Sequence, residues 1–264
     1  MKYIIAIANH KGGVGKTAST HALGAGLAQL GHRVLLVDVD PQSSLTNSCG
    51  VKVPGESLAE VFGSSEVGKL ALKDIIYDVG EEYGLPLHLA PSDIALATNE
   101  PGLINRYGRE NILKNALATV AADYDICLID CPPSLGILTI NALSAAQVVL
   151  IPTQPQIADM RGLQLFLDTL DAITTRGGIN PHLKVLGVLV TCVDDRLLHH
   201  RDALKVMTES GFPLLKTQIG RSVKVAEAAA SGASIIQYDP SNKQAENYRE
   251  LAKEVDTWLR NAHR

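Results

Sequence analysis

Short apolar runs, often β-branched, alternate with longer amphipathic stretches along most of the chain. Runs of about four to eight such residues are typical of strands covered on both faces, and amphipathic stretches are typical of helices. The strands predicted in this way span residues 3–9, 33–38, 85–90, 124–130, 148–152 and 184–191. The alternation predicts an α/β fold with a doubly wound, mostly parallel sheet that is flanked by helices on both faces.

Two helices and one irregular stretch refine this pattern. A helix over residues 16–30 is expected to stop at Gly31, because glycine readily adopts the left-handed conformation that ends helices. A last helix over residues 241–260 is expected to open at Ser241. Residues 43–80 are rich in Ser, Gly and Val, and we expect a mobile loop with short helices there. We find no repeat or linker, so residues 1–264 are expected to form one domain.

Composition narrows the class of protein. Hydrophobic residues make up 46% of the chain and charged residues 20%, which supplies a core and argues against disorder. The longest apolar runs fall far short of the roughly 20 residues that span a bilayer, and the first residues lack the pattern of a secretion leader. We therefore expect a cytoplasmic protein without a membrane association. Its four cysteines form no C-x-x-C pair and are expected to be reduced thiols.

Charge is unevenly distributed, although the formal net charge is −4. Residues 1–195 contain 13 Lys and Arg against 20 Asp and Glu, whereas residues 196–264 contain 11 against 8. This imbalance permits a basic face on the C-terminal part, although scattered solvated charges would give the same counts.

A glycine-rich loop between the first strand and the first helix is the strongest chemical signal in the sequence. It reads His10-Lys11-Gly12-Gly13-Val14-Gly15-Lys16-Thr17. Glycines let the backbone wrap closely round phosphates with its N–H groups pointing inward, and the helix N-terminus adds partial positive charge. We expect Lys16 to reach the β and γ phosphates and the Thr17 hydroxyl to bind Mg²⁺, so ATP and Mg²⁺ are the predicted cofactors.

Acidic residues follow two predicted strands. Asp38 and Asp40 stand at the end of the second strand, and Asp130 ends the strand over residues 124–130. Carboxylates at strand ends beside a phosphate loop can hold Mg²⁺ through water or orient the attacking water, although a strand-end aspartate is often a simple turn former. Their occurrence together with the lysine-bearing loop favours a nucleotide hydrolase.

The loop lacks the first glycine of the standard phosphate-binding pattern, where His10 stands, but it completes the variant K-G-G-x-G-K-[ST]. This variant resembles the deviant Walker A box of the ParA and MinD superfamily, and the chain resembles ParA/Soj-type partition ATPases. The likeness extends over nearly the whole chain, including residues 187–195, 223–228 and 238–241. It implies a slow ATPase that dimerises around ATP.

The resemblance assigns roles to individual residues. It implies that Lys11 reaches the phosphates of the other subunit, that Asp40 acts with Lys11 and Lys16 in catalysis, and that Asp38 supports Asp40. Asp130 is similar to the Walker B aspartate. The residues expected to contact ATP are Lys11, Gly12, Gly13, Val14, Gly15, Lys16, Thr17, Ala18, Asp38, Asp130, Gly220 and Ser222. Those expected at Mg²⁺ are Thr17, Asp40 and Asp130.

This sequence departs from the family pattern at two places around the nucleotide. Ala18 stands where the family usually has Thr, so a contact to the α phosphate there must come from the backbone N–H. The family's Ile-Pro-Arg-Asn near the adenine is replaced by Ile219-Gly220-Arg221-Ser222, and the resemblance places Gly220 and Ser222 of this segment at the nucleotide.

The resemblance also implies partners: a second copy of the chain, non-specific DNA, and a ParB-like or other adaptor that stimulates hydrolysis. Its cargo would be a plasmid, a chromosome origin or a protein body, and the protein would associate with the nucleoid. Phosphate-directed cations suffice for non-specific DNA binding. The candidates are Lys205, Lys216, Arg221, Lys224, Lys243, Arg249, Lys253, Arg260 and Arg264.

Two alternatives remain open from the sequence. A MinD-like membrane ATPase would need an amphipathic terminal helix, and Leu251, Val255, Trp258 and Leu259 do form one stripe, although such a stripe also packs on a core. A metabolic or iron-protein member of the superfamily would need cluster-binding cysteines, for which Cys131 beside Asp130 is one candidate without an evident second.

Overall fold

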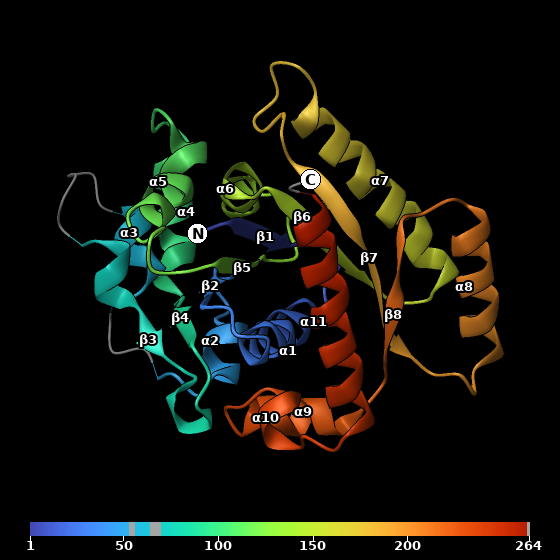
Figure 1. Cartoon of the computed structure of the whole chain (residues 1–264). Coiled ribbons are helices and arrows are strands. Elements are labelled where there is room, and N and C mark those ends of the chain that lie inside the picture. The colour runs from blue at the N-terminus through green and yellow to red at the C-terminus, as the bar shows by residue number, and fades with distance from the viewer. Residues whose placement is uncertain (53–55, 64–69, 263–264) are drawn as a thin grey trace.

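The structure, a computed structural model, describes residues 1–52, 56–63 and 70–262 (Figure 1). Within them, eight strands form one sheet in the order β3-β4-β2-β5-β1-β6-β7-β8. All neighbours are parallel except β3 and β4, which are antiparallel. The strands are β1 (Tyr3–Ile7), β2 (Val34–Asp38), β3 (Tyr77–Asp78), β4 (Leu87–Ala90), β5 (Ile126–Asp130), β6 (Val148–Thr153), β7 (Lys184–Val193) and β8 (Leu214–Gly220).

Helices cover both faces of the sheet. The α-helices are α1 (Lys16–Gln29), α2 (Ser44–Ser48), α3 (Leu58–Gly63), α4 (Ala95–Leu103), α5 (Ile112–Ala118), α6 (Ile137–Ala145), α7 (Ile157–Thr174), α8 (Leu198–Glu209), α9 (Val223–Ala230), α10 (Ile235–Tyr238) and α11 (Lys243–Asn261). Short 3₁₀ helices lie at Leu72–Ile75, Glu81–Tyr83 and Arg109–Asn111.

The two faces hold separate hydrophobic clusters, because successive strand side chains point to opposite sides. Ile5 and Ile7 of β1 belong to the cluster that includes α1, α2, α10 and α11. Ala6 belongs to the opposite cluster, with residues from α3 to α8. The predicted doubly wound α/β fold is therefore confirmed.

Helix α1 is buried nearly all round because it lies between the sheet and α11 (Figure 1). Two glycines permit this close packing. A Cβ at Gly24 would come within 2.6 Å of Leu36 of β2, and a Cβ at Gly26 within 2.9 Å of the Ala252 Cβ of α11. The helix ends as predicted before Gly31, which has a φ of 90°. Its start is thus fixed directly behind the glycine-rich loop.

Two strands were missed by the sequence reading. The edge strand β8 has buried Leu215 and Ile219 alternating with exposed polar residues, so it lacks the continuous apolar run of the central strands. The other edge strand, β3, has only two residues. The prediction that Ser241 opens the last helix is wrong: α11 begins at Lys243, and the Asn242 side chain accepts the cap hydrogen bond.

The stretch over residues 43–80 contains the expected short helices, α2 and α3, together with β3. Its described part also contributes to the core, because Leu45, Leu58 and Phe62 are fully buried. Residues 53–55 and 64–69 lie outside the described residues, so the predicted mobility remains a prediction. No helix in the described part of the chain is both long and apolar enough to cross a membrane.

Candidate nucleotide-binding site

The glycine-rich loop joins β1 to α1 and is fixed at its beginning by Asn9. The Asn9 side chain donates to the Pro152 carbonyl at 2.8 Å and accepts from the Lys11 N–H at 3.1 Å. Gly13 and Gly15 adopt φ values of 73° and 79°, which residues with a Cβ rarely adopt. The loop therefore needs glycine at these two positions, and Gly15 leads directly into α1.

Lys16 begins α1 and folds back over the loop. Its Nζ donates to the Lys11 carbonyl at 3.0 Å, and the residue is largely buried. Burial lowers the pKa of the Lys16 ammonium, an effect that the nearby Asp130 carboxylate opposes. A cation held in this way is available for phosphate oxygens at the mouth of the loop.

Asp130 receives hydrogen bonds from two hydroxyls of α1. Thr17 Oγ1 donates to one carboxylate oxygen at 2.7 Å, and Thr20 Oγ1 donates to the other at 3.2 Å. Burial, and then the neighbouring charge of Asp38, raises the pKa of Asp130. A buried carboxylate beside a hydroxyl is a set of hard oxygen ligands, and a divalent cation would offset the cost of its charge. Thr17 and Asp130 therefore fit Mg²⁺.

Asp38 and Asp40 have different surroundings. Asp38 is fully buried, with one oxygen accepting from the Thr46 N–H and hydroxyl, both at 2.8 Å, and the other from the Asp40 N–H at 3.1 Å. Asp40 lines the cavity, and its side chain accepts from the Gln42 N–H at 2.9 Å. Asp38 is not among the cavity residues, so it positions Asp40 and α2 from behind.

A cavity of about 520 Å³ opens in front of the loop, within the usual range for small-molecule sites. The predicted residues that line it are Gly12, Gly13, Gly15, Lys16, Thr17, Ala18, Asp40 and Ser222. Of the other residues predicted to contact ATP, Val14 is buried in the core, and its carbonyl accepts from the Thr191 hydroxyl at 2.8 Å. Gly220 is also absent from the lining, and its N–H donates to Gln244 Oε1 at 2.7 Å.

The far end of the cavity was missed by the sequence reading. It is formed by His21 of α1, Ser44 and Ser48 of α2, and residues of the α9–α10 segment: Val225, Ala226, Ala229, Ser234 and Ile235. His21 is buried and lies 3.3 Å from the Ser48 hydroxyl through Nδ1. Only the folded chain brings these segments together, so no local motif marks them.

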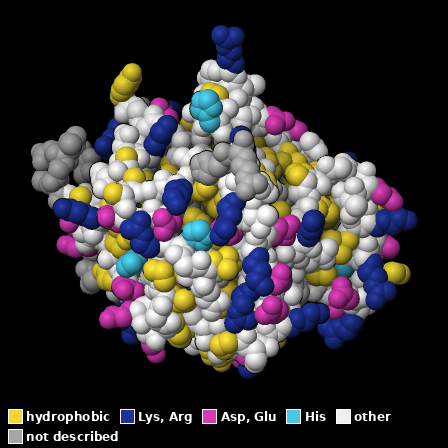
Figure 2. Space-filling view, in the orientation of Figure 1, with side chains coloured by type: hydrophobic (Ala, Val, Ile, Leu, Met, Phe, Trp, Pro, Cys, Tyr) yellow, Lys and Arg dark blue, Asp and Glu magenta, His cyan; other side chains and the backbone are white. Residues whose placement is uncertain are grey.

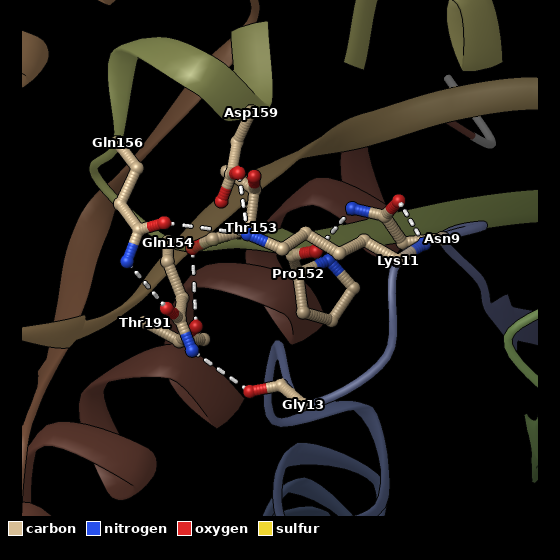
Figure 3. Close-up of polar contacts among 9 residues, drawn as sticks. All are labelled: Asn9, Lys11, Gly13, Pro152, Thr153, Gln154, Gln156, Asp159 and Thr191. Atoms are coloured by element: carbon tan, nitrogen blue, oxygen red, sulfur yellow. Dashed lines mark hydrogen bonds and ion pairs between the residues drawn. The ribbon is translucent and has the colours of Figure 1, made fainter. Parts of the chain in front are cut away.

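Lys11 is also absent from the cavity lining of its own chain. Its ammonium pairs with Asp159 of α7 and lies 3.3 Å from Gln156 Oε1 (Figure 3). Sequence reasoning missed both partners, which lie nearly 150 positions further along the chain. The lysine that family resemblance assigns to another subunit's phosphates is thus held by an internal carboxylate here.

The residues predicted to contact DNA are mostly paired within their own helices. Lys205, Lys224, Arg249, Lys253 and Arg260 each form an ion pair with a carboxylate three or four positions away. Figure 2 shows the same mixture, with basic and acidic side chains interspersed over the face that carries α11. Lys216, Arg221 and Lys243 are exposed and have no ion pair within the described residues, whereas Arg264 lies outside them.

The cysteines are free thiols, as predicted. Cys131 is buried, and burial raises the pKa of its thiol. Among the described residues, no group of three or more His, Cys, Asp or Glu side chains could hold a metal ion by itself. A magnesium site here would thus be completed by nucleotide oxygens and water.

The phosphate loop after β1, the Thr17–Asp130 pair and the cavity define a P-loop ATPase with a second lysine in its loop. The AAA domain family matches residues 2–185. The sporulation initiation inhibitor protein Soj of Bacillus subtilis is 41% identical over 256 residues, covering 97% of this chain and 98% of Soj. The chromosome partitioning protein ParA of Myxococcus xanthus is 36% identical over 253 residues, covering 96% and 87%.

Among solved structures, one named cobyrinic acid a,c-diamide synthase from Mycobacterium smegmatis, with a bound ATP analogue and magnesium, has a TM-score of 0.81. It is 37% identical, and the match covers 96% of this chain and 93% of that one. The chain therefore belongs to the ParA/MinD-type P-loop ATPases. The resemblance noted from its sequence is confirmed, and the cavity and its oxygen ligands suit the cofactors ATP and Mg²⁺.

Proposed function

We propose that this chain is an ATPase that dimerises around ATP, binds non-specific DNA as a dimer, and positions a cargo on the nucleoid. The observation that carries the proposal is the second loop lysine, Lys11, which lies outside the cavity of its own chain although Gly12, Gly13, Gly15, Lys16 and Thr17 of the same loop line it. The name of the chromosome partitioning protein ParA, whose match covers 96% of this chain, supports a role in partitioning.

Within one subunit, four side chains would divide the work on ATP. Lys16 would neutralise the β and γ phosphates, and Thr17 with Asp130 would hold Mg²⁺, which supplies charge neutralisation when bound. Asp40, kept in place by Asp38, would orient the attacking water. The attacking water would reach the γ phosphate only when the site is complete. Turnover would therefore be slow until an adaptor, ParB-like or of another type, adjusts the geometry of the site.

Between subunits, ATP would act as the connection. Its four negative charges, enclosed by two chains, require cations from both sides, so Lys11 of each subunit would complete the other's site. Pairing two subunits doubles the cations that face DNA, and each neutralised phosphate adds to affinity. Hydrolysis would remove the connection and release the DNA. The cargo class, whether plasmid, chromosome origin or protein body, follows from the adaptor.

The first test is sedimentation velocity of the ATP-free, ADP-bound and ATP-bound protein, with gel-shift binding to random-sequence DNA in parallel. Of these three states, we expect only the protein with ATP and Mg²⁺ to form a dimer and to shift DNA. Lys16→Ala should lose ATP binding, whereas Lys11→Ala should bind ATP but remain monomeric. A wild-type protein that stays monomeric with saturating non-hydrolysable ATP analogue and Mg²⁺ would disprove the proposal.

Two alternatives are separated by simple assays. The apolar stripe required for a MinD-like membrane helix is largely occupied, because Leu251, Val255 and Leu259 are buried against α1 and the sheet. Vesicle sedimentation with ATP tests this, since strong lipid binding without DNA binding would favour the membrane role. The name of the Mycobacterium smegmatis structure suggests an ATP-dependent amide synthesis as the second alternative. In that case, phosphate release should depend on an added carboxylic acid and an amine donor.

A further inference from the structure

The ion pair between Lys11 and Asp159 holds the loop lysine within its own chain. Asp159 lies in the first turn of α7, where the helix dipole favours a carboxylate. Gln156, just before α7, adds a second oxygen at 3.3 Å from the Lys11 ammonium. Figure 3 shows the lysine extended from the loop towards these two side chains. Asp159 and Gln156 therefore form a defined binding site for the Lys11 ammonium, called its receptor below, rather than an isolated surface contact.

Burial makes the pair unequal. The Asp159 side chain is 7% exposed and the Lys11 side chain 37% exposed. One Asp159 oxygen accepts from Lys11, while the other is buried without a hydrogen-bond partner among the described residues. Lys11 could find water easily if it left, but the Asp159 carboxylate would remain buried with neither oxygen satisfied. Departure of the lysine is therefore opposed chiefly by the needs of Asp159.

Two consecutive hydrogen bonds connect the receptor to the phosphate loop. The Gln156 amide donates to Gln154 Oε1 at 3.1 Å, and the Gln154 amide donates to the Gly13 carbonyl at 2.8 Å. Helix α7 also rests against the loop at His10, because a Cβ at Gly162 would come within 2.6 Å of the His10 ring. The start of α7 is thus held against the loop at three points: Gly13, Lys11 and His10.

We propose that Asp159, assisted by Gln156, is an intramolecular latch that withholds Lys11 from the partner subunit and so sets the threshold for ATP-dependent dimerisation. One ammonium cannot pair with Asp159 and at the same time neutralise phosphates bound by another chain. Dimerisation therefore requires that Lys11 leave its receptor. The latch rests on the proposed function, in which Lys11 acts across the dimer.

The latch predicts an unusual direction for one variant. Asp159→Asn keeps the shape of the side chain but removes the charge that holds Lys11, so the ATP-bound dimer should form about tenfold more tightly, equivalent to about 1.4 kcal/mol. ATP binding by the monomer should stay unchanged, because Asp159 does not line the cavity. Sedimentation at several protein concentrations with a non-hydrolysable analogue measures the dimer constant. The ATP affinity of the monomer is measured by titration of the monomeric variant Lys11→Ala, with and without Asp159→Asn.

Asp168→Asn is the matched control. It removes the same charge from an exposed position on α7, where its carboxylate accepts from Gln164 of its own helix at 2.8 Å. This control should leave the dimer constant unchanged, which separates the latch from a general effect of net charge. If Asp159→Asn weakens the dimer, Asp159 supports the active position of Lys11 and the latch is wrong.

A second measurement tests the pair in the ATP-free chain, independently of dimerisation. Lys11→Met leaves Asp159 without its cation and should destabilise the monomer, and adding Asp159→Asn should restore most of the loss. Additive effects in this double-mutant cycle would show that the pair does not form in solution and would overturn the latch. By contrast, strong coupling in the monomer together with a Lys11→Met protein that still dimerises with ATP would show that the pair forms but that Lys11 does not act across the dimer, which would refute the proposed function and with it the latch.

Discussion

Two buried carboxylates lie at the ends of neighbouring strands behind the cavity. Asp38 and Asp130 are partners in the β2–β5 ladder and both are shielded from water. Burial raises the pKa of both carboxyls, although hydrogen bonds from Thr46 oppose this at Asp38. Hydroxyl and backbone N–H groups satisfy these oxygens but carry no net charge, so a divalent cation beside Asp130 would add to the positive charge of the nearby Lys16.

His21 provides a residue-level test of the cavity's far end. Burial lowers its pKa from 6.5 to about 4, so the folded chain holds the neutral ring. Its contribution to stability is complete above pH 6.5 and is lost as the pH falls towards 4, by about 3 kcal/mol in total. The unfolding free energies of wild type and His21→Asn, measured by urea denaturation from pH 7 to 4, should differ less and less as the pH falls.

The comparison with a variant is needed because other groups titrate in the same range. Asp38 and Asp130, with raised pKa values, gain protons in the folded state and shift stability in the opposite direction. These effects are common to both proteins and cancel in the difference. A difference that stays constant over this pH range would mean that His21 is protonated, or solvated, in the folded protein.

Which residues could be predicted depended on how far apart they lie in the sequence. The glycine loop, Lys16 and Thr17 are contiguous, so their conformation follows from local chemistry, and Asp130 was marked by the end of its strand. Asp159 could not be predicted as the partner of Lys11, because nothing near either residue specifies the contact. Gly220 was predicted at the nucleotide, but its N–H is taken by Gln244, a contact made only on folding.

At the scale of elements, the packing of α11 on α1 fixes the position of the phosphate loop. The two helices touch at Gly26 and Ala252, with the Tyr248 carbonyl 3.4 Å from where a Gly26 Cβ would lie. On α1, Ser19 also lies 3.3 Å from the Tyr248 hydroxyl. Because α1 begins at Lys16, a shift of this helix would also move the lysine that faces the phosphates.

Gly26→Ala tests that contact. Alanine favours a helix over glycine by about 1 kcal/mol, but here its Cβ would overlap Ala252, and relief requires separating two packed helices. We expect a net loss of about 1–3 kcal/mol in the free energy of unfolding. The control is Gly102→Ala in α4, where a Cβ meets open space and should be neutral or stabilising.

A compensating change makes this prediction specific. Ala252→Gly removes the opposing Cβ, so it should be less costly in the Gly26→Ala background than alone, as measured by a double-mutant cycle in urea. Independent effects would show that α1 and α11 are not in contact at this point.

Strand β8 shows why one element could not be predicted from the sequence. Its exposed residues are polar, a composition that an edge strand tolerates, so the sequence has no continuous apolar run there.

On the scale of the whole molecule, the C-terminal part that carries the excess of basic residues also closes the nucleotide cavity. Ser222 lines the cavity and caps α9, and Arg221 directly precedes it. The Gly220–Gln244 hydrogen bond places the end of β8 beside the beginning of α11, which carries Lys243. Exposed cations and the nucleotide site therefore share one structural unit, which under the proposed function would give ATP a short route to the surface proposed to face DNA.

The pairing of basic residues predicts which of them matter for DNA. Arg221 is exposed without an ion pair among the described residues, whereas Lys253 already pairs with Glu250 at 2.7 Å. Arg221→Ala should therefore weaken DNA binding by the ATP dimer more than Lys253→Ala does. If each Arg221 of the dimer neutralises one phosphate, the negative slope of log affinity against log salt concentration should become less steep by about 2.

Filter binding to random-sequence DNA at four salt concentrations measures this slope, with a non-hydrolysable ATP analogue to hold the dimer together. Since Arg221 directly precedes Ser222, which lines the cavity, its variant must first be shown by sedimentation to dimerise as wild type does. A dimeric Arg221→Ala protein with an unchanged slope would place the DNA contact elsewhere. Equal losses for Arg221→Ala and Lys253→Ala would instead mean that Glu250 releases its lysine on contact with DNA, because the stronger phosphate field displaces an exposed ion pair.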